Sequence, residues 1–332
     1  MKEAMFYQKL EGDRVNCTLC PHRCLISPGK RGLCQVRENR DGTLYSLVYG
    51  KVVARDVDPI EKKPLFHFYP GTMAYSIGTV GCNFRCLYCQ NWTISQLGDK
   101  EIIGEELTPE QIVEDAIANK CQSIAYTYTE PTIFYEYALD IAKIAHERGL
   151  KNLFITNGYI SEEALKKLAP YLDAADVDFK SMNDSFYTKI CGGQLRPILD
   201  NIKLYYQLGV WTEVTTLIIP GYNDDVDELK KIAEFIVRIN ESIPWHVSRF
   251  YPAYKLTYVP PTPIEVLRKA VRIGKTAGLE YVYQGNVGEG ENTYCPGCGK
   301  LLIERIGFNT VENKVKNGNC PFCGRLIAGK GI

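Results

Sequence analysis

Gly81-Cys82-Asn83-Phe84-Arg85-Cys86-Leu87-Tyr88-Cys89 decides the fold, and it comes soon after the apolar run Met73-Ala74-Tyr75-Ser76-Ile77-Gly78. An apolar run of that length before a glycine-bearing loop predicts a buried strand. The three cysteines are therefore expected at the carboxyl end of a first strand, where α/β folds place their chemistry. Three thiolates are too few to close a tetrahedral zinc site or to ligate all four irons of a cubane cluster. Either a distant His or Cys completes the site, or one iron stays open for a small molecule.

The rest of the chain after residue 73 alternates short apolar strands with amphipathic helices. Strands are predicted at 73–78, 122–127, 153–156, 175–180, 213–219, 245–250 and 281–283. Strands that alternate with helices form a parallel sheet. Six or seven units, rather than eight, predict an incomplete barrel or a strongly curved open sheet.

Two smaller regions flank this predicted sheet. Residues 1–72 form a Cys-rich N-terminal region with strands expected in 43–53 and a proline-broken connector over 54–72. Residues 73–284 are the barrel. Residues 285–332 hold a glycine-rich segment, interpreted as a flexible linker, and a C-terminal cysteine group.

The composition is that of a globular protein with a real core. Hydrophobic residues make up 45% of the 332 residues, and Lys+Arg and Asp+Glu balance at 39 each. The balance gives no electrostatic support for binding nucleic acid or an anionic membrane. The first ten residues are polar and lack the apolar core of a signal peptide, and no apolar run is long enough to span a membrane.

Eleven of the 13 cysteines fall into three tight groups, which is typical of metal ligation rather than of a disulfide framework. This pattern predicts a reducing cytoplasm. Cys121 and Cys191 stand outside the groups. Cys121 is expected to be a small buried residue, and Cys191 receives no role.

The C-terminal group consists of two knuckles of the form C-P-x-C-G. Its cysteines are Cys295, Cys298, Cys320 and Cys323. Four thiolates close a tetrahedral structural zinc site, so the spacing predicts a zinc ribbon.

The N-terminal group has the spacing C-x2-C-x3-C-x9-C and consists of Cys17, Cys20, Cys24 and Cys34. Four cysteines within eighteen residues predict a metal site. The spacing leaves zinc and a second iron–sulfur cluster equally open. His22, between two of these cysteines, is expected to pack or cap rather than ligate.

The central motif, with Tyr88 directly before its last cysteine, resembles that of the radical S-adenosylmethionine (SAM) enzymes. The resemblance implies a partial (βα)6 barrel in which Cys82, Cys86 and Cys89 hold a [4Fe–4S] cluster. The fourth iron of the cluster is chelated by SAM. Electron transfer from this cluster cleaves SAM to a 5′-deoxyadenosyl radical, and the electron comes from a donor such as ferredoxin or flavodoxin.

The resemblance extends to residues that follow the later strands, and it implies that they bind SAM. Glu130, in the segment Thr127-Tyr128-Thr129-Glu130-Pro131, corresponds to an acid that binds the methionine ammonium, although Tyr128 and Thr129 stand where glycines are usual. Tyr88 corresponds to an aromatic residue near the adenine. Asn157, Asp178 and Lys180 match segments of glycyl-radical-enzyme activases. No histidine matches the ribose contact, and Arg249 is only a guess for it.

All three cysteine groups together resemble the radical SAM enzymes of the AmmeMemoRadiSam system, which are relatives of pyruvate formate-lyase activases. This resemblance covers essentially the whole chain and implies AMMECR1-type and Memo-type partner proteins. The expected function is hydrogen abstraction from a protein or peptide substrate. One alternative is activation of a glycyl-radical enzyme. Another is a non-catalytic, metal-stabilised binding or electron-transfer module.

Overall fold

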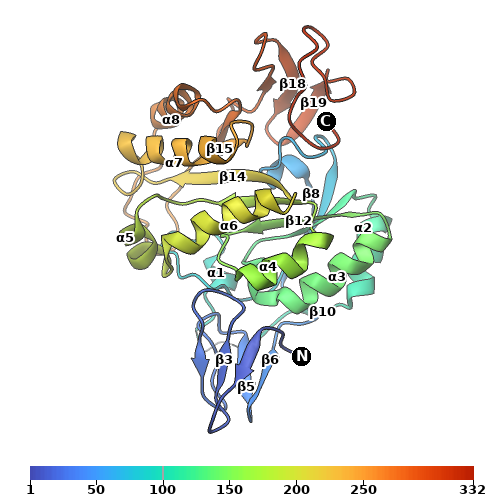
Figure 1. Cartoon of the computed structure of the whole chain (residues 1–332), viewed down its shortest axis with the longest axis vertical. Helices are drawn as coiled ribbons and strands as arrows, with labels where there is room; N and C mark the ends of the chain where they lie inside the picture. Colours follow the sequence, from blue (N-terminus) through green and yellow to red (C-terminus); the bar gives the residue numbers. More distant parts are fainter. Residues whose placement is uncertain (99–100) are drawn as a thin grey trace.

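Three parts follow one another along the longest axis of the molecule (Figure 1). The computed structural model describes residues 1–98 and 101–332. A β-rich lobe of N-terminal residues lies at one end, a sheet with its helices in the middle, and a second β-rich lobe with the C-terminus at the other end.

The middle part is built on one eight-stranded sheet in the order β16-β15-β14-β13-β12-β11-β9-β8. Seven of its strands are parallel: β9 (Met73–Gly78), β11 (Ser123–Tyr126), β12 (Lys151–Thr156), β13 (Ala174–Asp178), β14 (Trp211–Ile218), β15 (Trp245–Arg249) and β16 (Val282–Gly285). Each parallel strand lies beside its predecessor in the chain, and β8 and β16 form the two edges. The predicted parallel α/β sheet is confirmed, whereas its curvature into a partial barrel stays a prediction.

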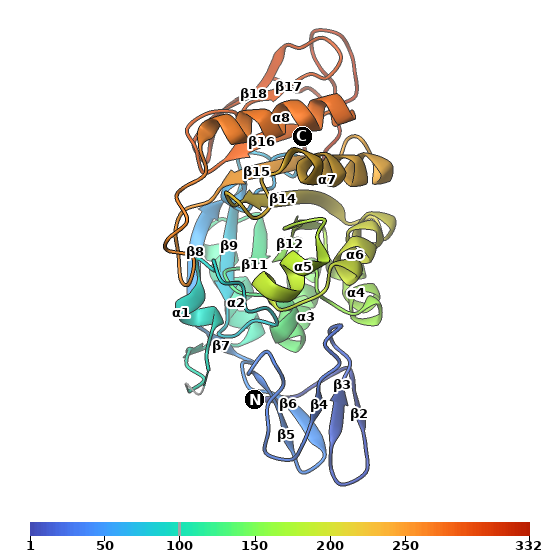
Figure 2. The same ribbon diagram turned by 90° about the vertical axis from the view of Figure 1, so that its left-hand side faces the viewer.

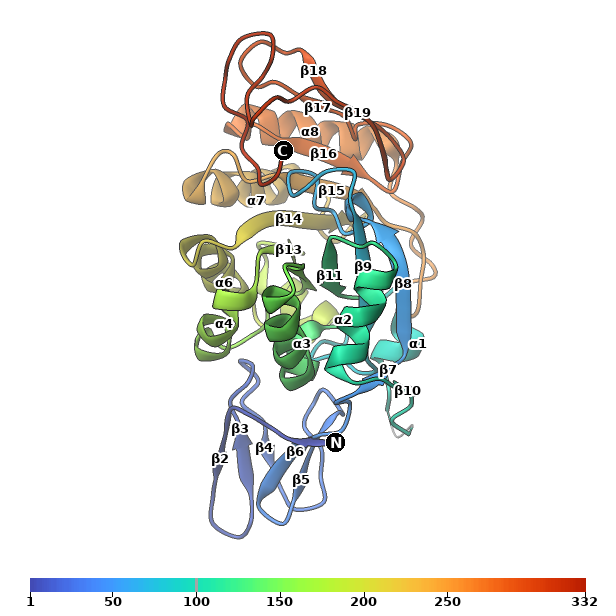
Figure 3. The ribbon, with the colours of Figure 1, turned by 90° about the vertical axis from the view of Figure 1, so that its right-hand side faces the viewer.

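The longer helices connect these strands in the order expected for repeated strand–helix units (Figure 3). They are α2 (Pro109–Ala118), α3 (Tyr135–Glu147), α4 (Glu162–Leu168, extended by η3, Ala169–Tyr171), α6 (Leu195–Gln207), α7 (Val226–Ile239) and α8 (Ile264–Ala277). Helix α2 begins with a capping box, because the Thr108 side chain accepts from the Gln111 backbone N–H and the Gln111 side chain accepts in return. The start of α2 is therefore encoded locally.

The eighth strand, β8 (Ala54–Pro59), differs from the sequence prediction. It pairs antiparallel to β9, with Asp58 opposite Ala74, whereas residues 54–72 are predicted to be a connector. The strand lies at an edge of the sheet and carries charged residues such as Arg55, so it lacks an apolar pattern. Pro59 ends the strand, where a missing N–H costs least. The short η1 (Ile60–Lys62) follows it.

The N-terminal lobe contains two small antiparallel sheets (Figure 2). One has the order β1 (Lys2–Glu3), β6 (Thr43–Ser46) and β5 (Arg37–Arg40); the other has β2 (Tyr7–Lys9), β3 (Val15–Cys17) and β4 (Leu25–Ile26). A further pair, β7 (Lys51–Val52) with β10 (Glu105–Glu106), joins this end of the chain to the middle part. The Arg37 side chain of β5 binds Glu136 of α3, so a buried ion pair fastens the lobe to the middle part.

The C-terminal lobe is a three-stranded antiparallel sheet of β17 (Thr293–Tyr294), β18 (Leu301–Ile306) and β19 (Asn309–Asn313). It packs around its own hydrophobic cluster, which includes Phe66 and Tyr283 from the middle part. Arg305 donates to the Phe66 carbonyl at 2.7 Å and fastens the lobe to the segment after β8. Within the described residues, no helix combines the length and the apolar character that crossing a membrane requires.

Candidate active site and metal sites

The three central cysteines lie between β9 and the short helix α1 (Trp92–Ser95), as predicted. Cys86 is buried, and Cys82 and Cys89 are half-buried. The Phe84 backbone N–H donates to Cys82 Sγ at 3.3 Å, and Cys89 Sγ lies 3.1 Å from Ser95 Oγ. The loop therefore supplies three thiols together with polar groups that interact with two of the sulfurs.

The chemistry of these thiols fits a cluster rather than free cysteines. Burial raises the pKa of Cys82 well above its ordinary value, and burial also raises that of Cys89. Both thiols would stay neutral at pH 7 without a metal, so cluster binding must displace their protons. A donor set of three thiols from one loop suits a four-iron cluster with one iron free for another ligand.

Asp178, the last residue of β13, and Lys180, two residues further on, lie near the cluster loop. Lys180 Nζ donates to Asp178 Oδ2 at 2.9 Å and lies 6.0 Å from the centre of the Tyr88 ring. Burial opposes the charge of Lys180, but Asp178, together with the nearby Cys86 and Cys191, raises the Lys180 pKa. The ammonium group therefore stays charged beside the cluster loop, where it can bind an anion.

Glu130 follows β11 and begins η2 (Pro131–Phe134). The carboxylate is 1% exposed and accepts four hydrogen bonds: from the Thr132 backbone and side chain, from the Thr156 side chain and from the Asn157 backbone, at 2.6–3.0 Å. These bonds tie the ends of β11 and β12 together. They account for the burial of Glu130 without a ligand, and its predicted contact with the SAM ammonium stays a prediction.

Asn157 and Asn83 connect the end of β12 with the cluster loop. Asn157 Nδ2 donates to Asn83 Oδ1 at 2.8 Å and lies 4.0 Å from Cys82 Sγ. The predicted site residues Asn157 and Cys82 are thus neighbours.

Tyr128 and Thr129 direct their side chains elsewhere. Tyr128 has a φ of 64°, in the left-handed region that favours glycine, and its hydroxyl donates to Asp58 at 3.1 Å. Thr129 Oγ1 donates to the Thr79 carbonyl at 2.9 Å. Both side chains already have partners within the protein, so their predicted contact with SAM stays a prediction.

Cys191, to which the sequence assigned no role, lies at the site. It ends the π-helix η4 (Tyr187–Cys191), which follows α5 (Asp184–Phe186), and its Sγ lies 3.5 Å from the Tyr88 hydroxyl. Its carbonyl accepts from the Arg85 backbone at 2.7 Å, so this segment lines the cluster loop. The sequence signal was the pair Gly192-Gly193: a Cβ at Gly193 would lie 2.3 Å from the Phe84 ring.

An open cavity of about 710 Å³ adjoins the site. Gln90, next to Cys89, lines it together with Arg249 of β15 and with Phe308 of the C-terminal lobe. The glycine-rich segment, interpreted from the sequence as a linker, forms another wall through Asn286 and Gly288. Arg249 stacks on Tyr251 at 5.1 Å, which leaves its contact with ribose a prediction.

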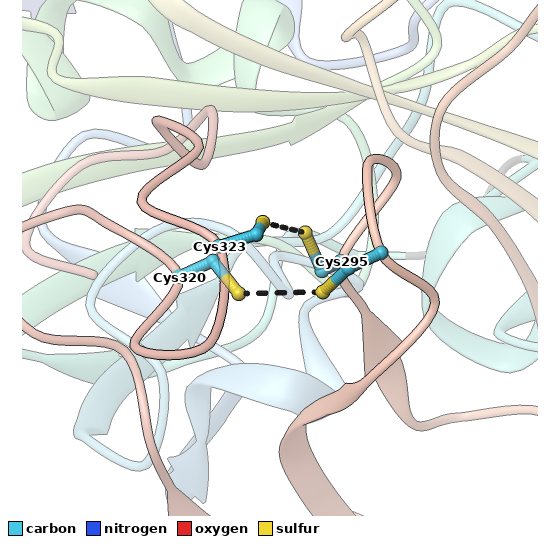
Figure 4. Close-up of side chains that lie close together, drawn as sticks. Cys295, Cys320 and Cys323 are labelled. Carbon is cyan, nitrogen blue, oxygen red and sulfur yellow. Dashed lines mark hydrogen bonds between the residues drawn. The ribbon is translucent and has the colours of Figure 1, made fainter.

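The C-terminal cysteines converge on one point (Figure 4). Their ligand atoms lie within 4.8 Å of one another, with Sγ–Sγ distances of 3.6 Å for Cys295–Cys323 and 3.7 Å for Cys298–Cys320. A tetrahedral zinc with Zn–S bonds of about 2.3 Å separates its sulfurs by about 3.8 Å. The four residues therefore fit a metal ion of zinc size.

The N-terminal cysteines lie on β3, on the turn after it, just before β4 and in the loop before β5. All four line one small cavity. His22 also lines it, but its Nε2 is 2.8 Å from the Asn83 carbonyl oxygen and its ring packs on Tyr159 at 4.9 Å. These contacts indicate that His22 packs in the protein rather than binding a metal, as predicted.

Residues 76–236 match the Radical SAM superfamily, from within β9 through α7. The matched segment contains the three central cysteines and the predicted SAM-binding residues from Tyr88 to Lys180. The chain is a radical SAM enzyme. The match does not favour the alternative prediction of a non-catalytic binding or electron-transfer module.

The chain is similar to several known proteins. An uncharacterized protein of Methanocaldococcus jannaschii is 53% identical over 98% of this chain and 99% of its own length. The pyruvate formate-lyase-activating enzyme of Clostridium pasteurianum is 28% identical over 50% of this chain and 72% of its own. The crystal structure of a radical SAM methyltransferase from Sphaerobacter thermophilus has a TM-score of 0.52 at 15% identity, over 70% of this chain and 71% of that one, and shares the fold.

Proposed function

We propose that this radical SAM enzyme removes a hydrogen atom from a protein or peptide substrate. The observation that carries the proposal is the three-cysteine loop, with Lys180 beside it and an open cavity of about 710 Å³ that is lined by Gln90, the residue after Cys89. A cavity of this size, walled partly by the C-terminal lobe, has room for several residues of a peptide.

The proposed roles of the residues follow from their positions. Cys82, Cys86 and Cys89 would hold a [4Fe–4S] cluster in a partial (βα)6 barrel. The cluster and SAM, when bound, supply one-electron reductive cleavage of the sulfonium and hydrogen abstraction. The residues that would orient SAM are Tyr88, Tyr128, Thr129, Glu130, Asn157, Asp178 and Lys180. Among them, Lys180 would pair with the carboxylate of SAM, because its ammonium is charged, nearly buried and close to the loop.

The substrate class is proposed from the relatives. Relatives named as activating enzymes of pyruvate formate-lyase support a protein substrate. Reductive cleavage of SAM would also need an electron donor such as ferredoxin or flavodoxin. A glycyl-radical enzyme is one candidate. The other is a partner of the AmmeMemoRadiSam system, of the AMMECR1 or Memo type.

We further infer that the C-terminal group holds zinc. The 13 free cysteines support a reducing cytoplasm.

The test is anaerobic reconstitution with iron and sulfide, chemical reduction, and chromatography for 5′-deoxyadenosine. The wild-type enzyme should form 5′-deoxyadenosine from SAM, and Cys82→Ala, Cys86→Ala and Cys89→Ala should each abolish it. Cys121→Ala is the matched control, because Cys121 is a buried cysteine outside the three groups. Equal product from all four variants would refute the proposal.

The substrate is tested separately. Candidate partner proteins are incubated with the reduced enzyme and SAM, frozen for electron paramagnetic resonance and digested for mass spectrometry. A glycyl radical on the partner identifies an activase, and a covalently altered peptide identifies a modifying enzyme. Uncoupled 5′-deoxyadenosine with neither signal on any protein or peptide would contradict a protein substrate.

A further inference from the structure

The N-terminal cysteines differ from the C-terminal ones in the spacing of their sulfur atoms. In the part of the chain that the structure describes, only Cys295, Cys298, Cys320 and Cys323 bring three or more such ligand atoms within 4.8 Å of one another. That spacing matches a single zinc ion. No three sulfur atoms of the N-terminal group lie that close together, and the same holds for the central triplet, which would hold a four-iron cluster. A cubane separates its thiolates on the order of 6 Å, because an iron stands between each sulfur and the centre.

The N-terminal thiols line a small cavity of about 20 Å³. Leu19, Ile26 and Ile133 line the same cavity, so it is largely apolar as well as enclosed. An apolar shell that limits solvent access is a means by which proteins control the reduction potential of a cluster.

Backbone and side-chain N–H groups lie around this cavity. Backbone N–H groups of His22, Leu33 and Val36 lie at the sulfurs of Cys20, Cys24 and Cys34, respectively. The Arg37 side chain lines the cavity and is 1% exposed, and its Nε has no hydrogen-bond partner among the described residues. A buried N–H without a partner costs free energy, and the sulfur atoms of a cluster would accept this one.

The cavity also touches the loop of the central cysteines. Asn83 lines it, and Asn83 Oδ1 lies 3.9 Å from Cys82 Sγ on the other side. A Cβ at Gly81 would lie 2.9 Å from the Cys34 carbonyl oxygen, so the two loops are in backbone contact. Only one layer of residues therefore separates the two cysteine groups.

We propose that Cys17, Cys20, Cys24 and Cys34 hold a second cluster of the [4Fe–4S] type, rather than zinc, packed against the loop of the central cysteines. Its four irons each carry a thiolate, so none is open to SAM or to substrate. The chemistry left to it is the exchange of single electrons with a low-potential donor. That role rests on the proposed function, whereas the identity of the cofactor does not.

The cofactor is tested by metal and sulfide counts on the whole chain, reconstituted with iron and sulfide after expression with both iron and zinc. In the triple variant Cys82→Ala/Cys86→Ala/Cys89→Ala, about four irons and four sulfides should remain per chain, with one zinc. Iron and sulfide lost altogether, with a second zinc in their place, would overturn the proposal.

A second variant tests the same proposal in case the triple variant folds poorly. Cys20→Ala/Cys24→Ala should lose about half of the iron and keep its zinc, while Cys121→Ala should lose neither. A loss of zinc with unchanged iron would overturn the proposal. This result is independent of SAM cleavage, because 5′-deoxyadenosine formed with a chemical reductant reports on the central cysteines alone.

The contact between the N-terminal cysteine loop and the central cysteine loop can be tested by spectroscopy. Electron paramagnetic resonance of the fully reduced wild-type enzyme should show lines broadened by interaction between two spins. The spectra of the two variants, added together, should lack this broadening. If the wild-type spectrum equals that sum, the clusters are not neighbours and the electron-exchange role is wrong.

Discussion

The buried ion pair between Arg37 and Glu136 should be the strongest single fastening of the N-terminal lobe. Two guanidinium nitrogens of Arg37 donate to the two Glu136 oxygens at 2.8 and 3.0 Å. The Met5 backbone N–H donates to the same carboxylate at 2.7 Å, and the Met5 carbonyl accepts from Arg37 at 2.9 Å. The side chains are 2% and 0% exposed, so water cannot replace either partner.

Glu136→Gln keeps the shape and an acceptor for Met5 but leaves the Arg37 charge buried without its counter-charge. Removing one partner of a buried pair costs about 3–5 kcal/mol. Replacing both charges costs much less, so Arg37→Met added to Glu136→Gln should restore at least about 2 kcal/mol of the free energy of unfolding. The two sites therefore form a double-mutant cycle with a large coupling energy.

The assay is urea unfolding of the anaerobically purified protein, followed by circular dichroism and by tryptophan fluorescence. Asp200→Asn is the control, because it breaks the exposed Arg196–Asp200 pair of α6 and should leave the unfolding midpoint unchanged. If Glu136→Gln costs no more than the control, or if the double variant shows the sum of the two single losses, the reasoning is refuted.

Three further predictions concern other parts of the molecule. Burial lowers the pKa of His67 to about 4, so between pH 6.5 and 4 the unfolded chain binds a proton that the folded chain excludes. The free energy of unfolding should therefore be complete above about pH 6.5 and fall by about 3 kcal/mol as the pH drops towards 4. In urea titrations at stepped pH, His67→Gln should remove this part of the pH dependence. Gly78→Ala would place a Cβ 2.7 Å from the Thr127 carbonyl oxygen, so it should lower the iron content and the melting temperature. Gly288→Ala is the control, because a Cβ there has no atom within 4 Å, and it should change neither. Equal iron content in both variants would contradict the close approach of Gly78 to Thr127. Cys298→Ser should release zinc, measured by atomic absorption, and make the C-terminal lobe sensitive to protease while the iron content stays unchanged; retained zinc would show that the four sulfurs do not act as one site.

Much of the fold could be predicted because its signals are local. The seven apolar runs became β9 and β11 to β16, and Thr108 caps α2 as its sequence indicates. Strand length, helix periodicity and caps depend on neighbouring residues. β8 was missed because its stability comes from hydrogen bonds to β9, and its charged residues carry no apolar pattern.

The candidate site could also be predicted only in part. The spacing of Cys82, Cys86 and Cys89 and the family match give the chemistry, and the two C-terminal knuckles give a metal site. The contact of Cys191 with Tyr88 could not be predicted, because it joins residues 103 positions apart through a π-helix and a close glycine approach.

The sequence by itself determined the alternation of strands and helices, the loop that supplies three thiols and the residues that follow each strand. Each of these depends on residue types at fixed short spacing. Only the tertiary structure decided how far apart the N-terminal sulfurs stand, which loop they face and which carboxylates are already satisfied. The contacts of Arg37 with Glu136, and of Asn83 with Cys82 and the N-terminal cavity, follow from how lobe, sheet and loop pack. That packing is set by the summed burial of the whole chain and not by any one segment of it.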